Sequence, residues 1–204
     1  NSIISATWIY TADKDNTLLN DHTIVISEDQ IFDILPTKDV FDKYEADDVF
    51  ALSDHIITPG LINNHTHAAM SLLKGYANDL PLKSWLEDHI WPAEKLHMCE
   101  NFVKDGSLIA IAEMIKSGTT TFNDMYFYPS QTAEAAVEMG IRANIGLVVM
   151  EFPTNYASDP EDYLKKGLDF RDEWRSEELI STSLAPHAPY TTSDKTLSLV
   201  GTYA

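Results

Sequence analysis

The chain has 204 residues, one cysteine and a formal net charge of −18, with the mixed composition of a globular protein. The negative charge argues against nucleic acid or an anionic membrane surface as a partner, because clustered Lys and Arg recognise both. The single Cys99 excludes an internal disulfide, and no apolar run approaches the ~20 residues of a membrane span or follows a basic leader, so the expected setting is the reducing cytoplasm.

The first 56 residues have the pattern of short strands joined by turns. Strand composition is present at 3–10, 22–27, 30–36 and 49–52. The polar cluster at 13–16 is typical of a turn. We expect a small meander that needs a larger partner to pack on, because a few short strands are marginally stable alone.

From residue 57 onward, strand patterns alternate with helix patterns. We expect strands at 57–67, 119–124, 142–150 and 180–187, and helices at 82–90, 102–116, 131–139, 160–175 and from 193 onward. Four β/α units in series predict a parallel sheet with right-handed crossovers. Such a sheet is either doubly wound or closed into a barrel.

Polar residues at the carboxyl ends of the predicted strands favour the barrel. His65 and His67 end the first strand, Asp124 the second and His187 the fourth, and Glu151 follows the third. These ends surround one mouth in a barrel, whereas a doubly wound sheet usually carries a glycine-rich phosphate loop, which this sequence lacks. Because four units are half a barrel with two open edges, we expect a fragment of a longer protein, or a remainder supplied separately.

The histidine pair is the strongest functional signal. Residues two apart in a strand point the same way, so His65 and His67 can direct both imidazoles at one point. A lone histidine is more often hydrogen-bonded in the interior or exposed at the surface. A pair that follows an apolar strand and Pro59-Gly60 instead indicates a divalent metal site.

Four motifs resemble the amidohydrolase superfamily. They are Pro59 to His67, Trp85 to Glu94, Gly118 to Met125, and Ala185 to Tyr190. The match is closest to the deaminase and chlorohydrolase branch, which includes the 5'-methylthioadenosine/S-adenosylhomocysteine deaminases. The resemblance implies a (β/α)8 TIM-type barrel, with residues 57–204 as its first half. It also implies a small β-sandwich built from both chain termini, with residues 1–56 as its N-terminal part.

The resemblance also implies a metal centre. One Zn²⁺, or Fe²⁺ in some relatives, would be held in each subunit by His65 and His67. A further His and an Asp that complete the ligand set, and a catalytic Glu, are expected beyond Ala204. His187 would contact the substrate or the attacking water as the catalytic residue of this half; otherwise it is a structural histidine at a strand end.

Three residues of the second motif are implied to bind substrate. Glu94 would accept hydrogen bonds from ribose hydroxyls, unless it is a surface carboxylate. Trp85 and Trp91 could form an apolar wall for the substrate or could simply pack. Asp124 could support the metal ligands or cap a strand end, and its role is left open.

The implied activity is metal-dependent hydrolytic deamination of an amino-purine nucleoside with release of ammonia, in a homo-oligomer that is a dimer or a tetramer. The segment 148–153 lacks an arginine that some relatives carry there. That difference leaves s-triazine chlorohydrolase and guanine deaminase as alternatives, beside an inactive truncated barrel. The strand at 180–187 has no lysine, which disfavours the two-metal cyclic amidases of the superfamily.

Overall fold

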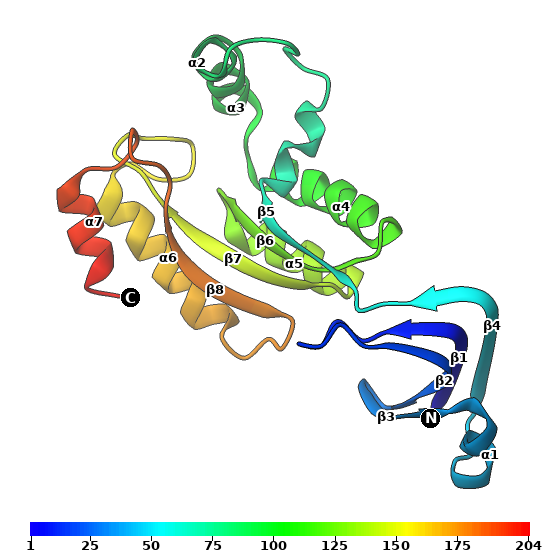
Figure 1. Ribbon diagram of the computed structural model, residues 1–204. Helices are drawn as coiled ribbons and strands as arrows, with labels where there is room; N and C mark the ends of the chain where they lie inside the picture. Colours follow the sequence, from blue (N-terminus) through cyan, green and yellow to red (C-terminus); the bar gives the residue numbers. More distant parts are fainter. The chain divides into compact units, whose positions relative to one another are not determined.

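The structure is a computed structural model that describes all 204 residues, and it divides into two compact units, Asn1–Pro59 and Gly60–Ala204 (Figure 1). The first unit contains β1 (Ser2–Tyr10), β2 (Leu18–Ser27), β3 (Gln30–Pro36), the 3-10 helix η1 (Thr37–Asp39), α1 (Val40–Lys43) and β4 (Asp48–Ile57). None of the helices in the chain has the length and apolar character that crossing a bilayer requires.

The first unit is one four-stranded sheet in the order β3-β2-β1-β4. The first three strands form the expected antiparallel meander, but β4 lies parallel to β1, so the expected meander is wrong for the fourth strand. The physical reason is the crossover through η1 and α1, because parallel neighbours require a longer connection than a hairpin. A small core of Ile3, Val25, Leu35 and Val40 lies between the sheet and α1.

The second unit contains a parallel sheet in the order β5-β6-β7-β8, with helices between the strands. Its elements are β5 (Leu61–Thr66), the 3-10 helix η2 (Ala68–Leu73), α2 (Leu82–Ser84), the π-helix η3 (Trp85–Ile90), α3 (Trp91–His97), α4 (Glu100–Lys116), β6 (Thr119–Tyr126), α5 (Pro129–Met139), β7 (Arg142–Val149), α6 (Pro160–Trp174), β8 (Ile180–Pro186) and α7 (Asp194–Gly201). The α/β class and the first four β/α units of the predicted barrel are confirmed.

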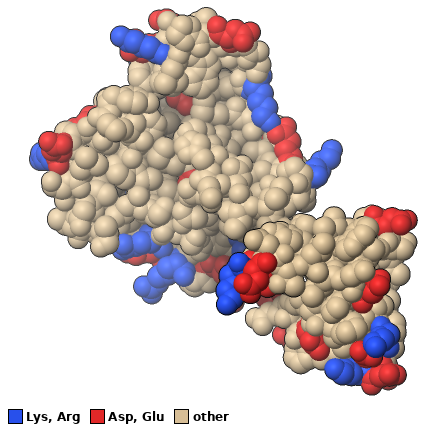
Figure 2. Space-filling view, in the orientation of Figure 1, with Lys and Arg blue, Asp and Glu red and all other residues tan.

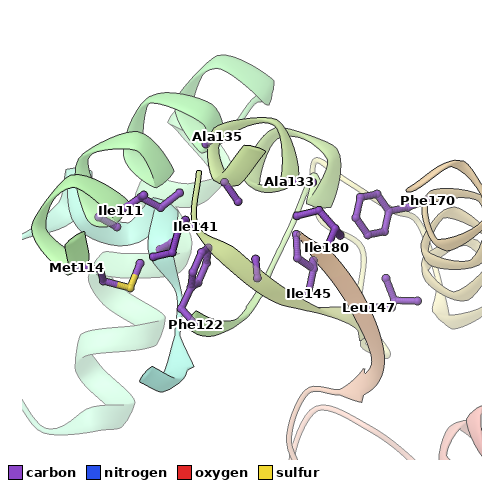
Figure 3. Packing of buried hydrophobic residues seen from close by; sticks show 14 residues of the cluster. Ile111, Met114, Phe122, Ala133, Ala135, Ile141, Ile145, Leu147, Phe170 and Ile180 are labelled. Carbon is purple, nitrogen blue, oxygen red and sulfur yellow. The ribbon is translucent and has the colours of Figure 1, made fainter. Parts of the chain in front are cut away.

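One side of this sheet is covered by helices α4, α5 and α6 (Figure 3). Phe122 of β6 and Ile145 of β7 are buried on that side, in one cluster with Ile111 of α4 and Phe170 of α6. The strands alternate, so neighbouring residues such as Asn123 and Asn144 face the opposite side. The uncovered side is the one that a closed barrel turns inward.

The predicted first strand, 57–67, needs correction. Ile57 ends β4 of the first unit, and β5 begins only at Leu61. Apolar residues continue across this break, but Pro59 has no N–H for a sheet ladder and interrupts the pairing. His67 is therefore the residue directly after β5, and the histidine pair straddles the end of the strand.

Candidate active site

The two histidines lie at an irregularity near the end of β5. Asn63 pairs with Phe122 and Thr66 pairs with Asp124. Between these two pairs, β5 advances by three residues while β6 advances by two. The extra residue forms a β-bulge, which redirects the side chains beyond it. The rings of His65 and His67 lie 5.0 Å apart between their centroids, in an edge-to-face arrangement.

The hydrogen bond of His67 suits a metal ligand. Its Nδ1 lies 2.7 Å from the carbonyl oxygen of Met125. Because a carbonyl only accepts, Nδ1 must carry the proton, and Nε2 keeps its lone pair for a cation. The donor chemistry of the pair therefore fits Zn²⁺ or Fe²⁺. The chain contains no group of three or more His, Cys, Asp or Glu side chains arranged to hold a metal, so the pair alone provides an incomplete ligand set.

Asp124 is buried beside this pair, with 1% of its surface exposed. Its Oδ1 accepts hydrogen bonds from the Thr66 hydroxyl and from the backbone N–H of Ala68, both at 2.7 Å. Burial raises the pKa of Asp124, and these two hydrogen bonds oppose the rise. The carboxyl group thus contacts the residues on either side of His67.

The insertion between β5 and α4 carries the three predicted substrate residues. Trp85 begins the π-helix η3, a helix type often found at functional sites. Glu94 of α3 is only 9% exposed, and its Oε1 accepts a 2.6 Å hydrogen bond from Tyr126. Burial raises the pKa of Glu94, and the Tyr126 hydroxyl opposes the rise. Glu94 is therefore not the surface carboxylate of the alternative interpretation.

His187 follows the end of β8. Its Nδ1 lies 2.9 Å from the Thr191 hydroxyl, which itself donates to the carbonyl of Ala188. A hydroxyl has a single proton, so the contact of Thr191 with Ala188 favours Nδ1 of His187 as the donor in this pair, which leaves Nε2 as an acceptor. Burial lowers the pKa of His187, as does the nearby His67, and both effects favour the neutral ring.

One cavity of about 180 Å³ brings most of these residues together. Its lining includes five predicted site residues from four segments of the chain: His67, Trp85, Trp91, Glu94 and His187. His65 does not line the cavity but is in ring contact with His67. Figure 2 shows that the facing surface of the second unit is hollowed and nearly free of charged side chains, which lie mostly at its margin.

A second cavity, of about 380 Å³, shares Trp91, Glu94, Phe127 and Met150 with the first. Its outer wall comes from the loop after β7. Asn155 attaches this loop to α3 by donating to the carbonyls of Lys95 and Met98, at 3.1 and 3.0 Å.

One residue of the site was absent from the sequence interpretation, and one predicted polar residue serves another part of the fold. Tyr126, the hydrogen-bond partner of Glu94, lines the cavity, and it directly follows the motif that ends at Met125. Glu151, predicted at the mouth, instead binds the start of α7: it accepts from the N–H of the N-cap residue Ser193 at 2.8 Å and from the Thr196 hydroxyl at 2.5 Å. These hydrogen bonds lower the pKa of Glu151.

Comparison with known proteins gives one consistent family. The amidohydrolase family model matches residues 56–204. A 5-methylthioadenosine/S-adenosylhomocysteine deaminase of Saccharophagus degradans is 46% identical over 202 residues, which are 99% of this chain and 45% of that protein. A 5'-deoxyadenosine deaminase of Methanosarcina acetivorans is 42% identical over 200 residues, 97% of this chain and 45% of the relative.

Among solved structures, a zinc-bound adenosine deaminase of Xanthomonas campestris superposes with a TM-score of 0.97 at 39% identity. The match covers 100% of this chain and 46% of that structure. The chain thus spans about half the length of the proteins that it matches.

Proposed function

The chain belongs to the amidohydrolase family, and from this premise we propose that it forms one half of a hydrolytic deaminase of amino-purine nucleosides, the half that contributes two histidine ligands to the metal. The observation that carries the proposal is the single cavity where His67, Glu94 and His187 meet beside two tryptophans. Deaminases of purine nucleosides among the relatives, at 46% and 42% identity, support the same class of substrate.

His65 and His67 would hold the metal, and we propose Zn²⁺ with one ion per subunit. We place the remaining ligands, a histidine and an aspartate, in the half of the relatives that this chain does not cover. When bound, the metal would supply a hydroxide nucleophile at neutral pH by lowering the pKa of water to about 7. The protonated Nδ1 of His67 supports this role, because it leaves Nε2 free.

Glu94 would orient the sugar. Tyr126 occupies Oε1 of its carboxyl group, so Oε2 can accept hydrogen bonds from ribose hydroxyls. Trp85 and Trp91 would offer apolar surfaces to the purine or to the substituent on the sugar. The cavity is otherwise lined mainly by apolar side chains, as is usual where a few polar groups fix the orientation of a ligand.

His187 would act near the reacting carbon. Burial and the nearby His67 lower its pKa and favour the neutral ring, in which Nε2 can accept a hydrogen bond from the attacking water or from the substrate amine. The amine-bearing ring carbon gains oxygen, and ammonia leaves. We also propose a cytoplasmic homo-oligomer; the single, exposed Cys99 supports the reducing compartment.

The experiment is a comparison of substrates with the complete natural protein loaded with zinc. Ammonia release is measured with 5'-methylthioadenosine, S-adenosylhomocysteine, 5'-deoxyadenosine, guanine and an s-triazine. The proposal expects release from the adenine nucleosides, with loss of the reaction in the presence of a chelator. Turnover of guanine or the triazine alone, or no turnover of any of the five by zinc-loaded protein, would reject it.

A further inference from the structure

Accurate placement of the histidine pair requires an irregular backbone. Asn63 points to the helix-covered side, where its amide donates to the sulfur of Met114 at 3.8 Å. Thr66 faces the same side, because its hydroxyl donates to Asp124. Strict alternation would place residues 63 and 66 on opposite sides of the sheet. The bulge between them resolves this conflict; His65 lies within the irregular stretch and His67 directly after it.

A bulge of this kind breaks the ladder and leaves backbone groups that need other partners. Two consecutive residues of β6 provide them. The Asn123 amide donates to the carbonyl of Asn64 at 3.0 Å, before the histidine pair. Oδ1 of Asp124 accepts from the Thr66 hydroxyl and from the Ala68 N–H, between and after the two histidines.

Both hydrogen bonds to Asp124 end on one oxygen atom, at the same distance of 2.7 Å. Since Ala68 is buried with 3% exposure, water cannot readily replace Asp124 as the partner of its N–H. Gly106 of α4 supports the same turn, because a Cβ at that position would lie 2.2 Å from the carbonyl oxygen of Ala69. The turn after β5 is thus fixed from two sides.

From this geometry we infer that Asp124 is a positioning residue for the metal centre: its Oδ1 binds the Thr66 hydroxyl before His67 and the Ala68 backbone N–H after it, and thereby keeps His65 and His67 converging on one point. The inference rests on the proposed function, since it gives the pair a metal to converge on. It assigns the effect to an acceptor atom rather than to the negative charge, which makes it separable from a purely electrostatic role.

The test measures metal affinity in the complete natural protein, with Zn²⁺ competition against a chromogenic chelator and with the visible absorption spectrum of the Co²⁺ form. Asp124→Asn keeps Oδ1 as an acceptor and removes the charge, whereas Asp124→Ala removes the acceptor. We expect Asn to stay within about threefold of the natural affinity and Ala to weaken it about tenfold or more, the usual range for residues that support metal ligands. The Co²⁺ spectrum should change only for Ala.

Asp33→Ala is the matched control. Asp33 of β3 also accepts two hydrogen bonds, from the Ile34 N–H and the Tyr44 hydroxyl, both at 2.8 Å, but it belongs to the first unit. It should not change metal affinity. The Thr66 hydroxyl lies 2.7 Å from Oδ1 of Asp124 and 3.0 Å from the Asn123 carbonyl, and Thr66→Val removes both contacts. It should weaken the affinity severalfold, so it provides the test if Asp124→Ala does not fold.

The outcomes separate the two claims. No zinc binding by the natural protein would reject the proposed function itself. Normal zinc binding that is unchanged in Asp124→Ala and Thr66→Val would reject the positioning role alone. Equal losses in Asp124→Asn and Asp124→Ala would also reject it, because the charge and not the acceptor geometry would then be responsible.

Discussion

The two sheets of this protein use their buried polar side chains differently. In the β1–β4 sheet, Thr23 is fully buried and bonds to the hydroxyls of Ser5 and Thr37, at 2.8 and 2.9 Å, so polar groups satisfy one another. Around the carboxyl ends of β5–β8, the half-buried His67 and the buried Glu94 of α3 are each bonded through one side-chain atom and line a cavity. A partly satisfied polar group in a cavity is available to a ligand, whereas a fully satisfied one stabilises the fold.

The strongest way to break this comparison is to remove one imidazole. His67→Ala should lower deaminase activity by at least about a thousandfold, or about 4 kcal/mol in transition-state stabilisation, because the metal is lost with it. Zinc content and ammonia release measure the effect. His55→Ala is the matched control, since His55 is an exposed histidine of β4. Equal losses in both variants would contradict the assignment.

The converse change removes packing from the first sheet. Leu35 is 5% exposed in the small core beside α1. Leu35→Ala should lower the local free energy of unfolding by about 3 kcal/mol. Amide hydrogen exchange of residues 1–59 measures this loss. Deaminase activity per folded molecule should stay within about twofold of that of the natural protein. If the variant lost zinc while the second unit stayed folded, the first sheet would contribute to the metal site, which contradicts the comparison.

Glu94 should show opposite effects on function and stability. Glu94→Gln turns an amide donor toward the sugar hydroxyls, so kcat/KM should fall about thirtyfold, mostly through KM. Burial raises the pKa of Glu94, so the folded protein binds its proton more tightly than the unfolded chain, and stability falls as pH rises between the two pKa values. The variant should therefore be more stable than the natural protein at neutral pH.

Steady-state kinetics and urea unfolding at pH 7 measure the two effects of Glu94→Gln. A variant that binds nucleosides as well as the natural protein does would remove Glu94 from the site. One that is less stable at pH 7 would show that the Tyr126 hydrogen bond outweighs the cost of burying the carboxylate.

The smallest expected effect is at Glu151, a residue at a strand end that serves the fold. Glu151→Gln should speed amide exchange in α7 severalfold at neutral pH and leave kcat unchanged. Hydrogen bonds lower the pKa of Glu151, so its contribution is present above the pKa of the unfolded chain and disappears as pH falls through the lowered pKa. A difference in α7 amide exchange between the natural protein and Glu151→Gln that persists below that pKa would contradict this role of the carboxylate.

Much of the second sheet could be predicted because its signals are local. Apolar runs separated by helical patterns gave β6, β7 and β8 within a few residues. The break between β4 and β5 could not be located in the same way, since Ile56 and Ile57 continue the apolar pattern to Pro59. Only the pairing with β1 shows that they belong to the first unit.

The site was predictable in its residue types and less so in its geometry. The spacing of His65 and His67 indicated a converging pair. A regular strand, however, would not have brought the Thr66 hydroxyl within hydrogen-bond distance of Asp124. The bulge that permits both is hydrogen-bonded by Asn123 and Asp124, about sixty residues away in the chain. Glu151 shows the opposite error of a sequence-based prediction. Its position after β7 suggests a role in the site, whereas its hydrogen bonds to Ser193 and Thr196 serve the start of α7.

The central claim is that two imidazoles at the end of β5 hold a catalytic metal. The most direct measurement is zinc-edge X-ray absorption of the complete natural protein, beside the His65→Ala and His67→Ala variants. The account predicts nitrogen scattering from imidazole at about 2.0–2.1 Å in the natural protein and its loss with the metal in both variants. A spectrum without histidine ligands, or one that neither substitution changes, would contradict it.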